Sequence, residues 1–162
     1  MILVTGAGGK TGKAVVRALA AARAPVRAFV RRADHEAALL ACGAQEVAVG
    51  DMRSAADWGR TAEGVRAVYH ICPNVHPDEV PIGQAAIAAA RAVGVEQFVF
   101  HSVLHPQTEA MPHHWNKLRV EEAVLASGLP FTIFQPAPYM QNVLAGLAGY
   151  HQPWHVHRAL PG

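Results

Sequence analysis

The residues with the clearest potential for chemistry form a glycine-rich turn near the amino terminus. The turn reads Gly6-Ala7-Gly8-Gly9-Lys10-Thr11-Gly12 and follows a short apolar run, Ile2–Thr5. Glycines at this spacing permit a tight turn, let the backbone approach a bound group and let the next helix pack closely on the strand. Free N–H groups at the start of that helix would bind a pyrophosphate. The sequence therefore predicts a dinucleotide site that includes Gly6, Gly8, Gly9, Lys10, Thr11 and Gly12.

The segment Gly9-Lys10-Thr11 also matches the end of the phosphate-binding loop found in nucleoside triphosphatases. That loop requires another glycine about five residues before Gly9. Val4 stands at that position, inside the expected strand. A triphosphate cradle therefore cannot form in the usual way, and the sequence disfavours a kinase or triphosphatase.

The residues after the second expected strand distinguish the two nicotinamide dinucleotides. A carboxylate there would bind the ribose 2′-hydroxyl of NAD and repel the 2′-phosphate of NADP. This chain has Arg31 and Arg32 instead, and two guanidinium groups suit bidentate contacts with a phosphate. The sequence favours NADP(H) as the cofactor. NAD(H) stays open, because the two arginines also fit a solvated loop in which Asp34 caps the next helix.

Further cofactor-binding residues are expected after the third and fourth strands. Asp51 and Met52 directly follow the third expected strand, where Asp51 would hydrogen-bond the adenine and Met52 would pack against it. Cys72 follows the fourth expected strand and is included among the cofactor-binding residues.

The rest of the chain supplies the elements that must position these residues. Short β-branched runs alternate with alanine-rich stretches of helical spacing, which predicts right-handed crossovers and a parallel sheet. The strands carry little polar alternation, as expected when both faces are buried. We predict an α/β fold, a doubly wound Rossmann-type parallel sheet of about six strands with helices on both faces. The expected strands are Ile2–Thr5, Val26–Val30, Glu46–Val49, Ala67–Ile71, Gln97–His101 and Phe131–Phe134.

Local signals mark several helix ends. Gly94 and Gly128 each follow a helical stretch, at a position that favours a left-handed residue. Pro112 suits the first turn of a helix, and Ser54 with Asp57 has the spacing of a capping box.

Composition excludes several classes of protein. Of the 162 residues, 51% are hydrophobic and 16% are charged, which predicts a globular domain and not a disordered chain. The net charge of +2 includes no long basic run, so no nucleic-acid partner is expected, and no apolar stretch is long enough for a membrane span. Two isolated cysteines predict reduced thiols and a cytoplasmic location. Among His151, His155 and His157, Pro153 breaks helical spacing and no carboxylate or cysteine is near, so no metal site is expected.

Several motifs together resemble the NmrA-like group of atypical short-chain dehydrogenases/reductases. Besides the glycine turn, they are the segments 113–117 (HHWNK), 126–133 (ASGLPFTI) and 135–142 (QPAPYMQN), with Glu121-Glu122 between the first two. The resemblance spans nearly the whole chain. It implies a cofactor that lies across the carboxyl ends of the strands, with its nicotinamide near Ser102, Lys117 and the segment from Pro136 to Tyr139. It also implies either an NAD(P)H-dependent reductase of a quinone-like or carbonyl acceptor, or a regulator that senses NADP(H) and binds a protein partner without turnover.

The candidate catalytic residues depart from the pattern of the wider superfamily. Typical members carry Tyr-x-x-x-Lys, whereas this chain has His113-x-x-x-Lys117, a variant that the NmrA-like group often shows. His113 and Lys117 share one helix face, so Lys117 would bind ribose hydroxyls and His113 would replace the missing phenol as proton donor. A solvent-facing His113 is the alternative. Ser102 would hydrogen-bond the substrate or the nicotinamide.

Members of the family continue well beyond this length. We therefore expect residues 1–162 to form one NAD(P)-binding domain. Residues from about 140 to 162 would be the start of a substrate lobe that is otherwise largely absent. Tyr150 and Trp154 would form an exposed apolar patch if such a lobe normally covers them, which predicts self-association into a homo-oligomer.

Overall fold

The computed structural model describes residues 1–73, 75–140 and 142 of the chain, in which strands and helices alternate. His151, His155 and His157 lie outside this described part, and so do Tyr150 and Trp154 of the expected apolar patch. The elements are, in order, β1 (Ile2–Thr5), α1 (Lys10–Ala21), β2 (Val26–Val30), a 3-10 turn (Ala33–His35), α2 (Glu36–Ala41), β3 (Glu46–Val49), α3 (Ala55–Ala62), β4 (Ala67–His70), α4 (Glu79–Val93), β5 (Gln97–His101), α5 (Pro112–Leu125) and β6 (Phe131–Phe134).

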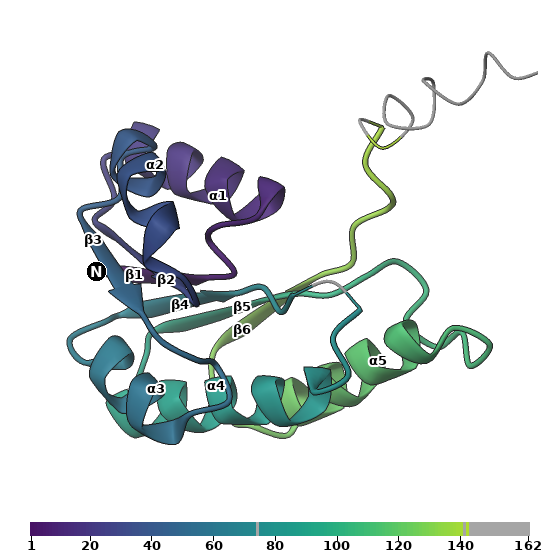
Figure 1. The fold of residues 1–162 in the computed structure, drawn as a ribbon. Coiled ribbons are helices and arrows are strands. Elements are labelled where there is room, and N and C mark those ends of the chain that lie inside the picture. Colours follow the sequence, from purple (N-terminus) through teal and green to yellow (C-terminus); the bar gives the residue numbers. More distant parts are fainter. Residues whose placement is uncertain (74, 141, 143–162) are drawn as a thin grey trace, which may run out of the picture.

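The strands form one parallel sheet in the order β3-β2-β1-β4-β5-β6. Helices α1 and α2 cover one face, and α3, α4 and α5 cover the other (Figure 1). The strand order reverses between β1 and β4, and open α/β sheets bind ligands outside the carboxyl ends of the strands at such a point. The expected doubly wound fold is confirmed, and its crevice lies next to the glycine turn.

The strand boundaries follow the apolar runs closely. Five of the six expected strands have the observed bounds, and β4 ends one residue early, at His70. The reason is local. The backbone N–H of Ile71 donates to Thr5 Oγ1 at 2.8 Å, and the Thr5 hydroxyl donates to the Ile71 carbonyl at 3.1 Å. Both backbone groups of Ile71 are therefore bonded to the Thr5 side chain, and Ile71 does not take part in strand pairing.

Two apolar clusters hold the layers together, one on each face of the sheet. Trp58 from α3 lies in the larger cluster, 2% exposed, and packs edge-on against Phe29 with ring centroids 5.4 Å apart. Its indole N–H donates to the Met52 carbonyl at 2.7 Å, so the buried polar atom is satisfied. Trp58 therefore anchors the loop after β3, which carries part of the predicted site.

The expected helix ends are mostly confirmed. Gly94 and Gly128 have left-handed φ values of 64° and 75°, and Pro112 opens α5. Ser54 caps α3 by accepting the Asp57 N–H at 3.2 Å. The reciprocal half of the capping box is absent, because the Asp57 carboxylate accepts the backbone N–H of Asp51 at 2.8 Å instead. No helix within the described residues combines the length and the apolar character that a bilayer crossing needs.

Helices α4 and α5 pack closely because Gly83 faces Val120. A Cβ built on Gly83 would meet Val120 Cγ1 at 2.6 Å and Cγ2 at 2.7 Å. By contrast, a Cβ on Gly59 in α3 would meet nothing within 4 Å. Alanine substitution at these two helical glycines therefore separates the effect of packing on stability from the effect of helix propensity.

We expect Gly83→Ala to lower the free energy of unfolding and Gly59→Ala to raise it. Overpacking costs about 1–3 kcal/mol, which opposes and outweighs the gain in helix propensity of ~1 kcal/mol at Gly83. Only the gain in propensity applies at Gly59. Urea denaturation of both variants measures the two changes, and a stabilised Gly83→Ala would show that α4 and α5 are packed more loosely than described.

Candidate cofactor-binding site

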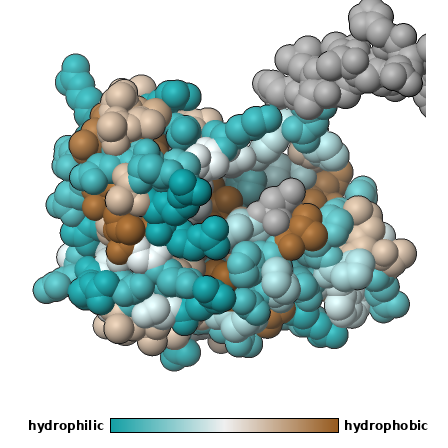
Figure 2. Space-filling model, in the orientation of Figure 1, coloured by the Kyte–Doolittle hydropathy of each residue, from teal (hydrophilic) through white to brown (hydrophobic). Residues whose placement is uncertain are grey.

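The carboxyl edge of the sheet is hollowed into a cleft of about 990 Å³ (Figure 2). The segments that follow all six strands contribute to its lining, together with the start of α5. Every residue that the sequence placed in the site lines this one cleft. They are Gly6, Gly8, Gly9, Lys10, Thr11, Gly12, Arg31, Arg32, Asp51, Met52, Cys72, Ser102, His113, Lys117, Pro136 and Tyr139.

The glycine turn has no room for side chains at the positions that shape it. Gly6 has a left-handed φ of 59°, and a Cβ there would meet the Ile71 carbonyl oxygen at 2.6 Å. A Cβ on Gly12 would meet Ala7 Cα at 2.5 Å. Helix α1 then begins at Lys10, and no side chain caps its N-terminus at Gly9. The backbone N–H groups at the positive end of α1 therefore face the cleft, as pyrophosphate binding requires.

Two arginines follow β2 at one end of the cleft. Arg32 pairs with Asp34, and both side chains are more than half exposed. Asp34 lies inside the 3-10 turn and pairs with Arg32, so the expectation that it caps the next helix is wrong. Within the described ranges no ion pair includes Arg31, whose charge helps to lower the pKa of Asp51. Arg31 is thus the arginine with a guanidinium available for another anion.

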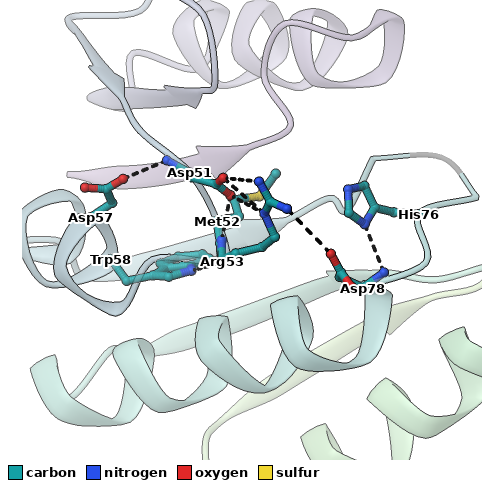
Figure 3. A network of polar contacts seen from close by, with 7 residues as sticks. All are labelled: Asp51, Met52, Arg53, Asp57, Trp58, His76 and Asp78. Carbon is teal, nitrogen blue, oxygen red and sulfur yellow. Dashed lines mark hydrogen bonds and ion pairs between the residues drawn. The ribbon is translucent and has the colours of Figure 1, made fainter.

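A third arginine, Arg53, was missed by the sequence analysis (Figure 3). Its Nη2 lies 2.6 Å from Asp51 Oδ2, its backbone N–H donates to Asp51 Oδ1 at 2.9 Å, and its Nη1 lies 3.8 Å from Asp78 Oδ2. These bonds from Arg53 lower the pKa of Asp51 to about 2. The Asp51 carboxylate is therefore ionised and already engaged, so adenine would have to share it with Arg53.

Lys117 and Glu79 form a buried ion pair at the other end of the cleft. Lys117 Nζ lies 2.8 Å from Glu79 Oε1, and their side chains are 14% and 3% exposed. The ammonium also donates to the His101 carbonyl at 3.3 Å and lies 5.2 Å from the centre of the Phe100 ring. The ammonium is thus held by one ion pair and one hydrogen bond, and an N–H donor remains for the cleft. Sequence reasoning missed Glu79, because an acidic residue at the first position of a helix is usually explained by the helix dipole alone.

Ser102 and His113 have different surroundings from those expected. The Ser102 hydroxyl donates to the buried Glu121 carboxylate, whose two oxygens also accept from Gln135 Nε2 at 3.0 and 2.9 Å. Ser102 therefore joins β5 to α5. His113 lines the cleft with its ring 4.5 Å from that of His114, and His114 donates from Nδ1 to the His105 carbonyl.

Three hydroxyl groups and one imidazole form a hydrogen-bonded network at the cleft, which the sequence analysis did not predict. Tyr69 Oη lies 3.1 Å from His101 Nδ1, and His101 Nε2 lies 2.9 Å from Tyr139 Oη. Thr11 Oγ1 donates to Tyr139 Oη at 3.1 Å. Tyr139 therefore connects the segment after β6 to the first turn of α1, across the cleft.

Two further titratable groups, His70 and Cys72, are buried near the cleft. His70 is fully buried, with Nδ1 2.9 Å from Thr5 Oγ1 and Nε2 without a hydrogen-bond partner in the described part of the chain. Burial and, to a lesser extent, the charge of Lys117 lower the pKa of His70 to about 3. Burial and the neighbouring Glu79 raise the pKa of Cys72, which is therefore a neutral thiol in the lining.

The ion pair between Lys117 and Glu79 predicts that removing one charge destabilises the fold more than removing both. Lys117→Met should lower the free energy of unfolding by about 3–5 kcal/mol, because Glu79 would be left as an uncompensated buried charge. Glu79→Gln/Lys117→Met should cost much less than Lys117→Met. Chemical denaturation measures both, with Lys13→Met as the control for loss of a lysine outside the cleft. If the double variant were the less stable one, the pair would not be the reason why Lys117 stabilises the fold.

His70 predicts a loss of stability in mild acid. Its pKa is 6.5 in the unfolded chain and about 3 in the folded one, so only the unfolded chain takes up this proton between those pH values. The free energy of unfolding should therefore fall as the pH drops below about 6.5, by up to about 1.4 kcal/mol per unit. Urea denaturation above about pH 4.5 avoids the carboxylates. His70→Phe should flatten the slope, and an unchanged slope would assign the pH dependence to other groups such as His101.

Comparison with known proteins places this geometry in a family. The model of the NmrA-like family matches residues 1–154. The chain is 37% identical to NAD(P)H azoreductase of Xenophilus azovorans over 149 residues, covering 89% of this chain and 50% of that protein. It is 36% identical to (4-alkanoyl-5-oxo-2,5-dihydrofuran-3-yl)methyl phosphate reductase of Streptomyces griseus, covering 100% of this chain and 56% of that reductase.

A solved structure agrees with these matches. The NADPH-dependent quinone oxidoreductase of Escherichia coli, crystallised with NADPH, superposes with a TM-score of 0.81 at 27% identity, covering 92% of this chain and 53% of the oxidoreductase. The chain spans about half the length of the relatives it matches. The glycine turn, the parallel sheet and these comparisons agree, and the chain belongs to the NmrA-like family.

Proposed function

We propose that the chain binds NADP(H) in the cleft and acts as an NAD(P)H-dependent oxidoreductase on a quinone-like or carbonyl acceptor. One observation carries the proposal. Residues predicted to bind the cofactor from separate segments of the sequence line a single cleft at the switch point of the sheet. The relatives support the reaction class, since they are named as NAD(P)H-dependent azo-dye and quinone reductases.

Each part of the cleft fits one part of the dinucleotide. The start of α1 would hold the pyrophosphate, because no side chain caps its N–H groups and the missing Cβ atoms at Gly6 and Gly12 let the turn pack tightly against Ile71 and Ala7. Arg31 would bind the 2′-phosphate, and Met52 would pack against the adenine. The remaining N–H donor of Lys117 would bind a ribose hydroxyl. Pro136, Cys72 and Tyr139 would flank the nicotinamide, which supplies a hydride when bound.

The expected size of the domain and the regulatory alternative stay predictions. We propose that residues 1–162 form one cofactor-binding domain. A regulator that only senses NADP(H) would require a partner protein whose affinity differs with and without the nucleotide. Reduction of an acceptor by the NADPH-loaded chain separates the enzyme from such a sensor.

Fluorescence titration with NADPH and NADH tests the cofactor site. We expect the wild-type chain to prefer NADPH, because the phosphate gains charge-assisted hydrogen bonds that NADH lacks. Arg31→Ala/Arg32→Ala should weaken NADPH binding by about 10- to 100-fold, since hydrogen bonds to charged groups contribute ~1.5–3 kcal/mol. NADH binding should change little.

Arg91→Ala is the matched control, because Arg91 is exposed in the last turn of α4 and does not line the cleft. It should leave both affinities unchanged. Equal loss of NADPH and NADH binding in the double variant would mean that the arginines act on the fold and not on the 2′-phosphate. Absence of binding by the wild-type chain would remove the proposed function altogether.

A further inference from the structure

A hydrogen-bonded chain joins four side chains, of which Thr11, His101 and Tyr139 line the cleft. It runs from Tyr69 on β4 to His101 on β5, then to Tyr139 after β6 and Thr11 on α1, with distances of 3.1, 2.9 and 3.1 Å. We call this set the relay. Its members come from four different segments, so it exists only in the folded chain.

Tyr139 is the relay member that presents a phenol to the cleft. It is 41% exposed and belongs to the cleft lining, whereas Tyr69 is partly buried and is absent from that lining. Backbone bonds fix the segment around it, since Leu104 N–H donates to the Pro136 carbonyl at 3.0 Å and Asn142 N–H donates to the Tyr139 carbonyl at 2.9 Å. The phenol is thus presented to the cleft from an anchored backbone.

The protons of the relay can be arranged in two ways. Thr11 donates to Tyr139, so the single proton of Tyr139 is directed either to His101 Nε2 or away from it, into the cleft. In the second case His101 donates from Nε2 to Tyr139 and accepts from Tyr69 at Nδ1. These two arrangements differ in the tautomer of His101 and in the direction of the two phenol protons. A neutral imidazole is required for both, and burial, with the charge of Lys117, lowers the pKa of His101.

Lys117 lies beside the relay. Its Nζ donates to the carbonyl of His101, so Lys117 and the Tyr139 phenol both contact the same residue. Typical superfamily members place tyrosine and lysine on one helix, at Tyr-x-x-x-Lys. Here His113 occupies the tyrosine position and takes no part in the relay, and the Ser102 hydroxyl is engaged by Glu121.

We propose that Tyr139 is the proton donor of the reaction, with His101 and Tyr69 as the path that restores its proton. This inference rests on the proposed function. The acceptor that has received the hydride takes a proton from Tyr139 Oη at its carbonyl oxygen or azo nitrogen, and the O–H bond breaks. The phenolate then takes the proton from His101 Nε2, while Nδ1 takes one from Tyr69. Water returns the last proton to Tyr69, so the relay ends in the first arrangement, and exchange of the His101 proton with water restores the second.

The step depends on groups from every element around His101. Tyr69 approaches from β4, Tyr139 from the segment after β6 and Lys117 from α5. Lys117 is the cation among them, and it opposes a second proton on His101. The imidazole therefore passes one proton at a time and does not store charge.

The test compares Tyr139→Phe with Tyr69→Phe and with His105→Asn as the control. His105 is exposed, lies outside the cleft lining and has a φ of 56°, which asparagine tolerates. NADPH affinity is measured first by fluorescence, and turnover then with menadione and the azo dye methyl red. Tyr139→Phe should keep NADPH affinity within about threefold and lower kcat by about 10²- to 10⁴-fold, the range of general acid catalysis. Tyr69→Phe should lower kcat less.

A measurement without turnover accompanies the kinetics. In the ¹⁵N spectrum of the unliganded chain, Tyr139→Phe should move the Nε2 resonance of His101, Tyr69→Phe should move Nδ1, and His105→Asn should move neither. Unchanged His101 resonances in both phenylalanine variants would overturn the relay.

The kinetic outcomes are equally decisive. Wild-type kcat in Tyr139→Phe would overturn the donor role. So would NADPH binding by the wild-type chain without reduction of either acceptor, which would leave the cofactor site standing. Failure to bind NADPH would instead count against the proposed function, so the two failures are distinguishable.

Discussion

The close approach of the first turn to the end of β4 is the constraint on which the cleft depends. Gly6 passes the Ile71 carbonyl so closely that a Cβ would meet its oxygen at 2.6 Å, and the Thr5 hydroxyl binds both backbone groups of Ile71. The ends of β1 and β4 are thereby joined at the point where the strand order reverses. The start of α1 and the segment after β4 therefore both line the cleft.

Buried carboxylates fix the rest of the cleft. Glu79 and Glu121 are 2% and 6% exposed, yet each has a partner from a distant segment, Lys117 in one case and Ser102 with Gln135 in the other. Such pairs contribute little net stability, because desolvation offsets their attraction, but an alternative arrangement would leave a buried charge unpaired. They therefore specify where β5, β6 and α5 meet, and that junction carries the relay.

The sequence predicted the fold and the lining better than it predicted the contacts. Strand positions followed from apolar runs between glycines, and the lining followed from residues directly after strands, because parallel strands bring their carboxyl ends to one edge. Glu79, Arg53, His101 and Tyr69 were missed, because a pair such as Lys117 with Glu79 joins residues that no local spacing relates. For the same reason the engagement of Ser102 by Glu121 was not foreseen. Local sequence patterns specify helices and strands, whereas side-chain pairs between distant segments are determined by the tertiary structure.

The start of α4 contacts two cations of the cleft lining, Arg53 and Lys117. Asp78 lies 3.8 Å from Arg53, which follows β3, and the next residue, Glu79, pairs with Lys117 on α5. Both carboxylates lie at the positive end of the α4 dipole, which stabilises their negative charge. The His76 imidazole accepts the Asp78 N–H at 3.0 Å and fixes the turn that leads into the helix. One helix start therefore contacts both cations, and the close packing at Gly83 holds α4 against the helix that carries Lys117.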